Sequence, residues 1–306
     1  MVKNTVREIM GDVIPTEGLG GKVLFAEFVH NDYLFAYIGK ILYNESGLQH
    51  IHVMENAFWG RMLFINNNLQ FTVRDEFIYH EALVHIPVQA SPKNSIKKVL
   101  ICGGGDFGAS RELLKYSQIE EVIIVDIDPK IPEIVKKFFP ELLPENPEDP
   151  RLKLITADAY EMVKKYLQEG KKFDLVIIDS TDPDTSEVGE IQELSHALFA
   201  VDFHRMLREL CPEGIIVQQC GTPFTMKNIF VETYKIFKKV YPEKEIFCFR
   251  ADVPSFGGDN AYIMRCPYEN PEVPKWEELP NTFYYSHEVH RCSFGLPKFW
   301  REALKV

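Results

Sequence analysis

The sequence has 306 residues, of which 45% are hydrophobic and 26% charged, and its formal net charge is −11 at pH 7. A chain of this length can form one large domain, or one large and one small domain, with a full hydrophobic core. The negative charge disfavours a nucleic-acid partner, because proteins that bind the phosphate backbone usually carry the opposite sign.

No segment approaches the roughly 20 uncharged apolar residues that a membrane span needs. The first residues also lack the apolar core of a signal peptide. The six cysteines are scattered and form no C-x-x-C pair, which argues against a metal cluster or a disulfide framework. We therefore expect a cytoplasmic protein with no metal and no membrane partner.

Residues 1–75 are predicted to form a small antiparallel β domain made of hairpins. Short runs rich in β-branched and aromatic residues, separated by Asn, Gly and Asp, predict strands at 22–28, 33–43, 50–55 and 61–65. A helix is predicted next, over residues 74–88.

From residue 97 onward, strands are predicted to alternate with helices. Continuous Val/Ile runs indicate strands at 99–102, 122–126, 152–157 and 175–179, with helices at 109–116, 132–139 and 159–168. This order implies a parallel sheet with helices on both sides. Helices at 200–210 and 226–240 and strands at 214–219, 245–250 and 261–265 are predicted to follow. Residues 76–306 are thus expected to form an α/β, Rossmann-like domain, whose tail packs on the domain surface or at a subunit contact.

Acidic residues follow each of the first four strands of this domain. The first strand leads into Gly103-Gly104-Gly105-Asp106-Phe107-Gly108, which fits the pattern G-x-G-x-x-G, and Asp126, Asp158 and Asp179 follow the next three. Any one of them could be a helix N-cap, but ligands of such sheets bind beyond the carboxyl ends of the strands, where all four would converge. Asp106 would repel a pyrophosphate, so a cationic, S-adenosylmethionine-like ligand is favoured over NAD.

Three stretches resemble the spermidine synthase (polyamine aminopropyltransferase) family: residues 70–81, residues 103–112 and Asp179-Ser180-Thr181-Asp182-Pro183. The similarity runs from about residue 28 to the C-terminus. It implies a small N-terminal β domain followed by a methyltransferase-type Rossmann domain, assembled as a homodimer or homotetramer. It also implies polyamine and nucleoside substrates, with decarboxylated S-adenosylmethionine as co-substrate and no further cofactor.

The resemblance assigns roles to individual positions. Donor contacts are expected from Gln49, Gly103, Gly105, Asp106, Asp126, Asp158 and Ala159. Acceptor contacts are expected from Gln70, Tyr79, His80, Asp182, Gln219 and Phe256. Asp179 is the expected general base, assisted by the hydroxyl of Tyr79.

The chemistry of aminopropyl transfer needs these residue types. The leaving group is a neutral thioether, so no general acid is required. The acceptor amine has a pKa near 10 by analogy with lysine, and a base must remove its proton before it attacks. Carboxylates such as Asp106 and Asp182 would hold the two ammonium ends in line.

Several positions depart from the family pattern. Val253-Pro254-Ser255-Phe256 replaces a motif that often ends in tyrosine, which puts putrescine in doubt as the acceptor. Phe107 stands where glycine is usual and would narrow the pocket, and the segment after Pro183 is longer and more acidic. The acceptor is not settled by these positions: it could be spermidine, agmatine, cadaverine or putrescine.

Three other functions also remain open. A methyltransferase on the same fold would use intact S-adenosylmethionine, and a carboxyaminopropyltransferase would use a donor that keeps its carboxylate. The glycine loop has no Lys or Arg to offset that carboxylate, which favours the decarboxylated donor. The third function is a non-catalytic sensor of polyamine or nucleoside.

Overall fold

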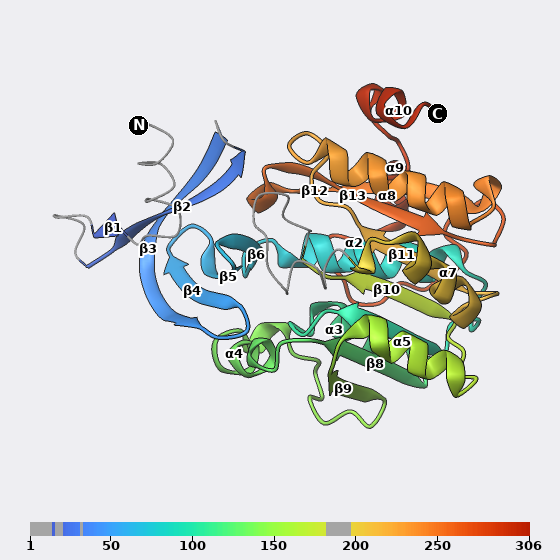
Figure 1. The fold of residues 1–306 in the computed structure, drawn as a ribbon, viewed down its shortest axis with the longest axis horizontal. Coiled ribbons are helices and arrows are strands. Elements are labelled where there is room, and N and C mark those ends of the chain that lie inside the picture. Colours follow the sequence, from blue (N-terminus) through green and yellow to red (C-terminus); the bar gives the residue numbers. More distant parts are fainter. Residues whose placement is uncertain (1–13, 16–20, 31–32, 182–196) are drawn as a thin grey trace. The chain divides into compact units, whose positions relative to one another are not determined.

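The protein is described by a computed structural model that covers residues 14–15, 21–30, 33–181 and 197–306. The chain divides into two compact units, Met1–Glu76 and Phe77–Val306. Each unit is built around its own sheet (Figure 1). Within the described ranges, no helix combines the length and the apolar character that crossing a bilayer would require.

The N-terminal unit is a six-stranded antiparallel sheet in which each strand pairs with the next one along the chain. Its strands are β1 (Ile14–Pro15), β2 (Val23–His30), β3 (Tyr33–Ser46), β4 (His50–Asn56), β5 (Gly60–Ile65) and β6 (Asn68–Thr72). The expected hairpin domain is therefore confirmed. The short strands β1 and β6 were not predicted from the sequence.

The turn between β5 and β6 explains how β6 forms. Asn66 and Asn67 have φ angles of 48° and 66°, the left-handed region that two-residue hairpin turns require and that asparagine tolerates better than most residues. Asn66 also accepts a hydrogen bond from the backbone N–H of His50 on β4 (2.9 Å). The turn is thus fixed by local backbone chemistry, and β6 returns along β5 with Leu69 and Phe71 buried.

The second unit contains a seven-stranded sheet with the order β12-β13-β11-β10-β7-β8-β9. The strands are β7 (Lys98–Gly103), β8 (Glu121–Asp126), β9 (Leu152–Thr156), β10 (Leu175–Asp179), β11 (Ile215–Gln219), β12 (Ile246–Val253) and β13 (Gly258–Arg265). The five strands from β11 to β9 are parallel, which confirms the predicted Rossmann-like α/β fold. β13 runs antiparallel to both its neighbours, because the short turn from β12 to β13 leaves no room for a crossover helix.

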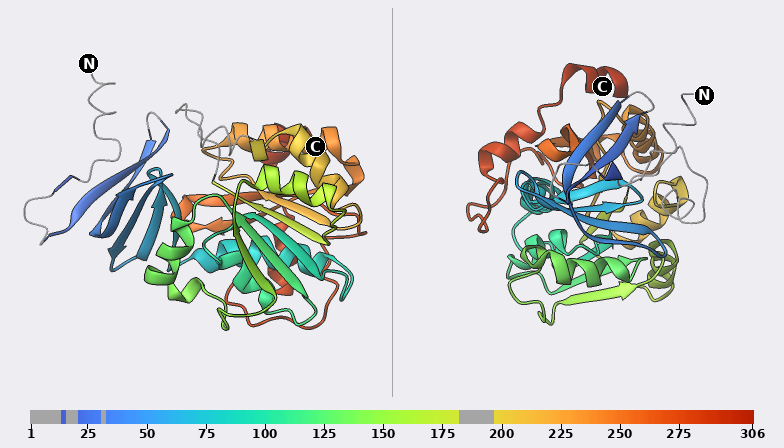
Figure 2. Two further views of the ribbon diagram at one scale, coloured as in Figure 1. Left: turned by 60° about the horizontal axis from the view of Figure 1, so that its bottom comes forward. Right: turned by 90° about the vertical axis from the view of Figure 1, so that its left-hand side faces the viewer.

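Helices lie along both faces of this sheet (Figures 1 and 2). They are α2 (Glu76–Ala90), α3 (Gly108–Leu114), α4 (Lys130–Phe138), α5 (Ala159–Gln168), α7 (Val201–Leu210), α8 (Lys227–Val240), α9 (His287–Ser293) and α10 (Lys298–Leu304). Short 3-10 turns occur at η1 (Pro140–Leu142), η2 (Glu243–Glu245) and η3 (Pro254–Phe256).

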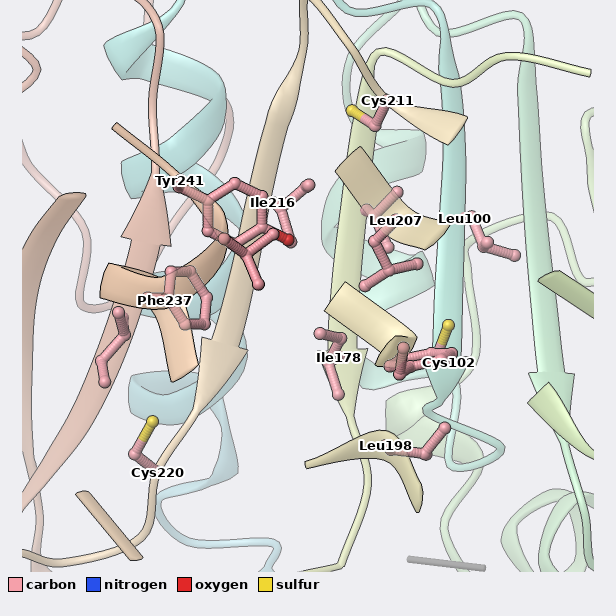
Figure 3. Close-up of a cluster of buried hydrophobic side chains, with 14 of the residues drawn as sticks. Leu100, Cys102, Ile178, Leu198, Leu207, Cys211, Ile216, Cys220, Phe237 and Tyr241 are labelled. Atoms are coloured by element: carbon pink, nitrogen blue, oxygen red, sulfur yellow. The ribbon is translucent and has the colours of Figure 1, made fainter. Parts of the chain in front are cut away.

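One face of the sheet packs against α5, α7 and α8 through a continuous apolar cluster. Leu100, Cys102 and Ile178 from the strands belong to one buried cluster with Leu207 of α7 and Phe237 of α8, and all five side chains are almost fully buried (Figure 3). Because strand side chains alternate between faces, the neighbouring residues of β7 and β10 point the other way, toward the side on which α2 lies. Because β11, β10, β7, β8 and β9 are parallel, their carboxyl ends lie together at one edge of the sheet.

Candidate active site

The carboxyl ends of β7, β8 and β10 bring the glycine loop together with two carboxylates. Gly103 pairs with Asp179 across β7 and β10 and has a φ of 86°. A Cβ at Gly103 would lie 2.1 Å from the backbone oxygen of Asp179, and the N–H of Gly104 donates to that same oxygen at 3.0 Å. Only glycine allows this close approach, so the loop sequence itself places Asp179 beside the loop.

Asp126, at the end of β8, is held against the loop by backbone donors. Its Oδ2 accepts the N–H of Gly105 and its Oδ1 accepts the N–H of Asp128, both at 2.9 Å. A Cβ at Gly105 would lie 2.7 Å from Asp126 Oδ2. Burial raises the pKa of Asp126 to about 6, although the two backbone N–H groups oppose the shift.

Asp106 lies inside the loop and faces a histidine. Its Oδ1 accepts the N–H of Gly108 at 2.8 Å, and its Oδ2 lies 3.6 Å from Nε2 of His80. Burial alone would raise the pKa of Asp106, but His80, the Gly108 N–H and Arg111 together outweigh burial and hold that pKa below its usual value. Asp106 is therefore a negative charge at neutral pH.

Asp179 has a contrasting environment. The hydroxyl of Tyr79 donates to its Oδ1 at 2.5 Å, while its Oδ2 is buried and has no hydrogen-bond partner within the described part of the chain. Burial, followed by the charge of Asp106, raises the pKa of Asp179 to about 6. Burial and the Asp179 charge also raise the pKa of Tyr79 well above its usual value, so the phenol stays protonated as a donor.

The His80 ring fits into the site because the residue facing it on the neighbouring helix is a glycine. A Cβ at Gly108, the first residue of α3, would lie 2.3 Å from the His80 ring. The ligand atoms of His80, Asp106 and Asp179 all lie within 4.8 Å of one another. Two carboxylates and an imidazole this close favour a cation, and an ammonium, a sulfonium or a divalent metal ion would suit them.

Aromatic rings form an apolar wall next to this polar cluster. The ring of Tyr79 contacts Phe256 of η3 edge-on, with centroids 5.9 Å apart, and contacts Tyr262 of β13 at 5.7 Å. The Tyr262 hydroxyl lies 3.4 Å from the backbone oxygen of Tyr79. Phe256, a predicted acceptor contact, thus lies beside Tyr79, and its role stays a prediction. Tyr262 was not foreseen because its strand shows only a continuous buried pattern.

Three other predicted positions follow their strands as expected. Asp158 caps α5 and accepts the N–H of Tyr160 at 2.8 Å, and Ala159 behind it is buried. Gln219 uses its side chain at the end of β11: it donates to the Ser180 backbone oxygen at 2.8 Å and accepts the Gly221 N–H at 2.9 Å. Asp182, the predicted acceptor ligand, lies outside the described residues.

Gln49 and Gln70 belong to the N-terminal unit. Gln49 ends the turn between β3 and β4, where its backbone oxygen accepts the N–H of Gly47 at 2.9 Å. Gln70 lies on β6, and its Nε2 donates to the backbone oxygen of Asn68 at 3.0 Å. The roles of both residues stay predictions.

Sequence reasoning missed a buried polar network behind the site. His85 of α2 bridges the Tyr116 hydroxyl and a carboxylate oxygen of Glu112, both at 2.8 Å. Burial opposes ionisation of Glu112, but His85, Arg111 and Lys115 outweigh it and lower its pKa to about 2. This network ties α2, which carries Tyr79 and His80, to α3, which follows the glycine loop. The sequence did contain one sign of this network: Glu81, His85 and Gln89 are polar and lie four residues apart in an otherwise apolar helix.

Comparison with known families gives matches over both units. Residues 76–274 match the spermine/spermidine synthase domain, and residues 25–72 match the spermidine synthase tetramerisation domain. Curated relatives named polyamine aminopropyltransferase are similar over most of their length. The protein of Thermoanaerobacter sp. strain X514 is 35% identical over 83% of this chain and 87% of its own. That of Buchnera aphidicola subsp. Acyrthosiphon pisum strain Tuc7 is 35% identical over 86% of this chain and 90% of its own.

Solved structures give the same similarity in three dimensions. A spermidine synthase in complex with the transition-state analogue AdoDATO is 28% identical, with a TM-score of 0.82 over 98% of this chain and 99% of its own. The spermidine synthase of Thermotoga maritima is 27% identical, with a TM-score of 0.79 over 98% of both chains.

Proposed function

The chain belongs to the spermine/spermidine synthase family, and from that premise we propose that it transfers an aminopropyl group to an amine in polyamine biosynthesis. The observation that carries this proposal is the cluster of His80, Asp106 and Asp179, whose ligand atoms lie within 4.8 Å of one another. The reaction joins two cations, and such a cluster can hold both and accept a proton.

The donor is decarboxylated S-adenosylmethionine in this proposal. Asp126 lies at the end of the second strand, where a carboxylate can accept hydrogen bonds from ribose hydroxyls, and Asp158 lies at the end of the third, beside the expected adenine position. The ionised Asp106 would bind the ammonium of the aminopropyl tail. A carboxylate on the donor would meet Asp106 and Asp179, and Coulomb repulsion disfavours it there.

Asp179 is the proposed general base. The amine nitrogen attacks the aminopropyl carbon bonded to sulfur, the C–S bond breaks, and 5′-methylthioadenosine leaves as a neutral thioether. The proton of the attacking amine passes to Asp179, whose pKa of about 6 leaves it ionised at neutral pH yet more basic than an ordinary aspartate. The Tyr79 hydroxyl, 2.5 Å from Oδ1, orients that carboxylate.

The acceptor is an amine whose aliphatic part lies against the aromatic wall. Tyr79 and Phe256 offer ring surface, and Phe256 has no hydroxyl that could bind a second ammonium at that point. This arrangement is better suited to methylene groups than to the far charge of a short diamine. His80, Gln70, Gln219 and Asp182 are the other proposed acceptor contacts.

A product assay by mass spectrometry tests the function. The purified protein is incubated with decarboxylated S-adenosylmethionine and with the intact molecule, each against putrescine, cadaverine, agmatine and spermidine. We expect 5′-methylthioadenosine and one aminopropylated amine from the decarboxylated donor only. Transfer of a labelled methyl group to any amine would instead indicate a methyltransferase, and a carboxylated product would indicate the carboxyaminopropyl reaction. Tight ligand binding with no product over hours would indicate a sensor.

We also propose that the protein forms a homo-oligomer through its N-terminal unit. Residues 25–72 match a tetramerisation domain. On β3, the large hydrophobic residues Tyr33, Leu34 and Ile38 are 43–48% exposed to solvent, as expected for residues that a partner subunit would cover. Light scattering on the purified protein should give a multiple of the 35.4 kDa chain mass.

A further inference from the structure

Helix α2 carries polar residues on the side that faces away from the proposed catalytic pair. Every residue from His80 to Ala90 is buried, and among them Glu81, His85 and Gln89 follow one another at intervals of four. Residues at this spacing share one face of a helix. A buried polar face needs partners, and the C-terminal segment supplies many of them.

Glu81 makes the most concentrated of these contacts. Its Oε1 accepts the backbone N–H of Phe283 at 2.8 Å, and its Oε2 accepts the backbone N–H groups of Tyr284 at 2.8 Å and Tyr285 at 2.7 Å. Glu81 itself is only 1% exposed. Three successive amides converging on one carboxylate form a clamp between the helix and a segment about 200 residues later in the chain.

The same segment is attached to α2 along the rest of this face. Tyr285 also contacts the His85 ring, with centroids 5.3 Å apart. At the other end of α2, Gln89 accepts the N–H of Lys275 on its backbone oxygen at 2.8 Å, and the Trp276 indole donates to the Ser91 oxygen at 2.8 Å. The C-terminal segment therefore contacts α2 at both ends, through residues 275–276 near Gln89 and through residues 283–285 at Glu81.

The clamp lies two residues from the tyrosine that contacts the proposed base. Successive side chains of a helix are about 100° apart, so Glu81 points roughly opposite to Tyr79, with His80 between them. A hydrogen bond of 2.5 Å from Tyr79 to Asp179 tolerates little rotation of the helix about its axis. A fixed carboxylate on the far side of the same turn resists that rotation.

We propose that Glu81 is a positioning residue for the transfer reaction: by clamping residues 283–285, it fixes the rotation of α2 and holds the Tyr79 hydroxyl on Asp179. This inference rests on the proposed function, since it assigns Glu81 an effect on the catalytic pair. A carboxylate is required because all three partners are donors. Glutamine would place its own N–H₂ group against at least one of them.

Steady-state kinetics of Glu81→Gln test the proposal. We expect kcat to fall by about tenfold or more, because a small misplacement of catalytic groups is costly, while the donor KM stays within about twofold. The deciding measurement is a double-mutant cycle with Tyr79→Phe. If Glu81 acts through Tyr79, Glu81→Gln has much less effect on kcat in the Tyr79→Phe background. Equal effects in both backgrounds, or an unchanged kcat, would overturn the proposal.

Ser286→Ala provides the matched control. Ser286 caps α9 by accepting the Val289 N–H at 3.2 Å, so its loss weakens the C-terminal segment without touching α2. We expect this variant to keep the wild-type kcat. A Ser286→Ala loss as large as that of Glu81→Gln would show that only the stability of the segment matters, and would refute a specific role for Glu81.

Hydrogen exchange of the wild-type protein keeps the proposal testable if Glu81→Gln does not fold. The amides of Phe283, Tyr284 and Tyr285 should be protected to a degree similar to the amides of α2, and exchange at unprotected rates would refute the clamp. The product assay on the wild-type protein separates the two failures. If the wild type makes no product, the proposed function is refuted. If the wild type makes product but the effects of Glu81→Gln and Tyr79→Phe on kcat are additive, only the role of Glu81 is refuted.

Discussion

The hydroxyl of Tyr79 lies 2.5 Å from Oδ1 of Asp179, although the two residues are 100 positions apart in the chain. Tyr79 comes from a helix that precedes the Rossmann-like sheet, and Asp179 ends its fourth strand in chain order. The contact joins a protonated phenol to a carboxyl group whose pKa is raised to about 6. The following predictions concern this pair and the groups that hold it.

Asp179→Asn should abolish most of the activity and stabilise the fold. Loss of the base should lower kcat by about 10²–10⁴-fold. Because the folded-state pKa is raised from 3.8 to about 6, the energetic penalty of ionising buried Asp179 develops as the pH rises above 3.8 and is complete above about pH 6. The neutral amide removes that penalty, so we expect a higher free energy of unfolding at pH 7.5 by urea denaturation. An active variant would contradict the assignment of the base.

Tyr79→Phe should retain the ring contacts with Phe256 and Tyr262 and lose only the hydrogen bond to Asp179. We expect kcat to fall by about 10–100-fold, since one oriented hydrogen bond at the reacting centre is removed. Donor affinity measured by calorimetry should stay near the wild-type value. A large loss of donor affinity with normal kcat would assign Tyr79 to binding alone.

Activity should decline below about pH 6, where Asp179 becomes protonated. The rate should fall about tenfold for each further pH unit if one group controls it. The negative charge of Asp106 contributes to the raised pKa of Asp179, so in Asp106→Asn the acidic limb should move to lower pH. Measuring kcat against pH at saturating donor checks both points. A limb that moves to higher pH in this variant would contradict the electrostatic coupling.

Gly108→Ala should displace His80, because the added Cβ would lie 2.3 Å from its ring. We expect a large loss of turnover with an acceptor KM that rises, since His80 and Asp106 separate. Gly170→Ala is the control: Gly170 has a φ of 67°, and an added Cβ there would meet no atom within 4 Å, so alanine strains the backbone and leaves the site alone. Equal loss of activity in both variants would point to general destabilisation.

Stability of the N-terminal unit should fall in acid because of His52. Burial lowers its pKa from 6.5 to about 4, and neither ring nitrogen has a hydrogen-bond partner in the described ranges. The stability from neutral His52 is complete above pH 6.5 and is lost as the pH falls toward 4, by roughly 3 kcal/mol.

His52→Phe should flatten this dependence and raise stability at neutral pH, since the ring already packs against Phe25 and Phe64. Urea denaturation at pH 7 and pH 5 measures the difference. His50→Gln is the control, because His50 is only half-buried and bonded to Asn44. The same pH dependence in wild type and His52→Phe would assign the acid sensitivity to other groups.

The order of elements and the glycine loop could be predicted from the sequence. Continuous apolar runs mark the middle of β7, β8 and β10, because strands covered on both faces bury nearly all of their side chains there. β7 ends in glycine because Gly103 has no room for a side chain. The antiparallel β13 was not foreseen, since a buried strand has the same composition in either direction.

The carboxylates were identifiable by sequence position, but their different protonation behaviour was not. Asp106, Asp126 and Asp179 have the same side chain, but their surroundings differ. His80 helps to lower the pKa of Asp106, whereas burial raises the pKa values of Asp126 and Asp179. The spacing of Glu81, His85 and Gln89 marks a polar face of the helix, but it does not identify the partners of Glu81. Those partners are backbone N–H groups 202 to 204 positions away, and backbone donors are the same in every sequence.

The amino-acid sequence by itself determined local matters: which segments become strands and helices, where the chain must turn with glycine, and which carboxylates end neighbouring strands. These follow from backbone sterics and from the side chain's preference for water or the interior, which act over a few residues. The family resemblance paired Tyr79 with Asp179, but only the tertiary structure decided that the Tyr79 hydroxyl donates directly to Oδ1 and that Glu81 clamps the C-terminal segment. Such contacts, and the pKa values they set, depend on distances and burial that exist only once remote segments have packed together.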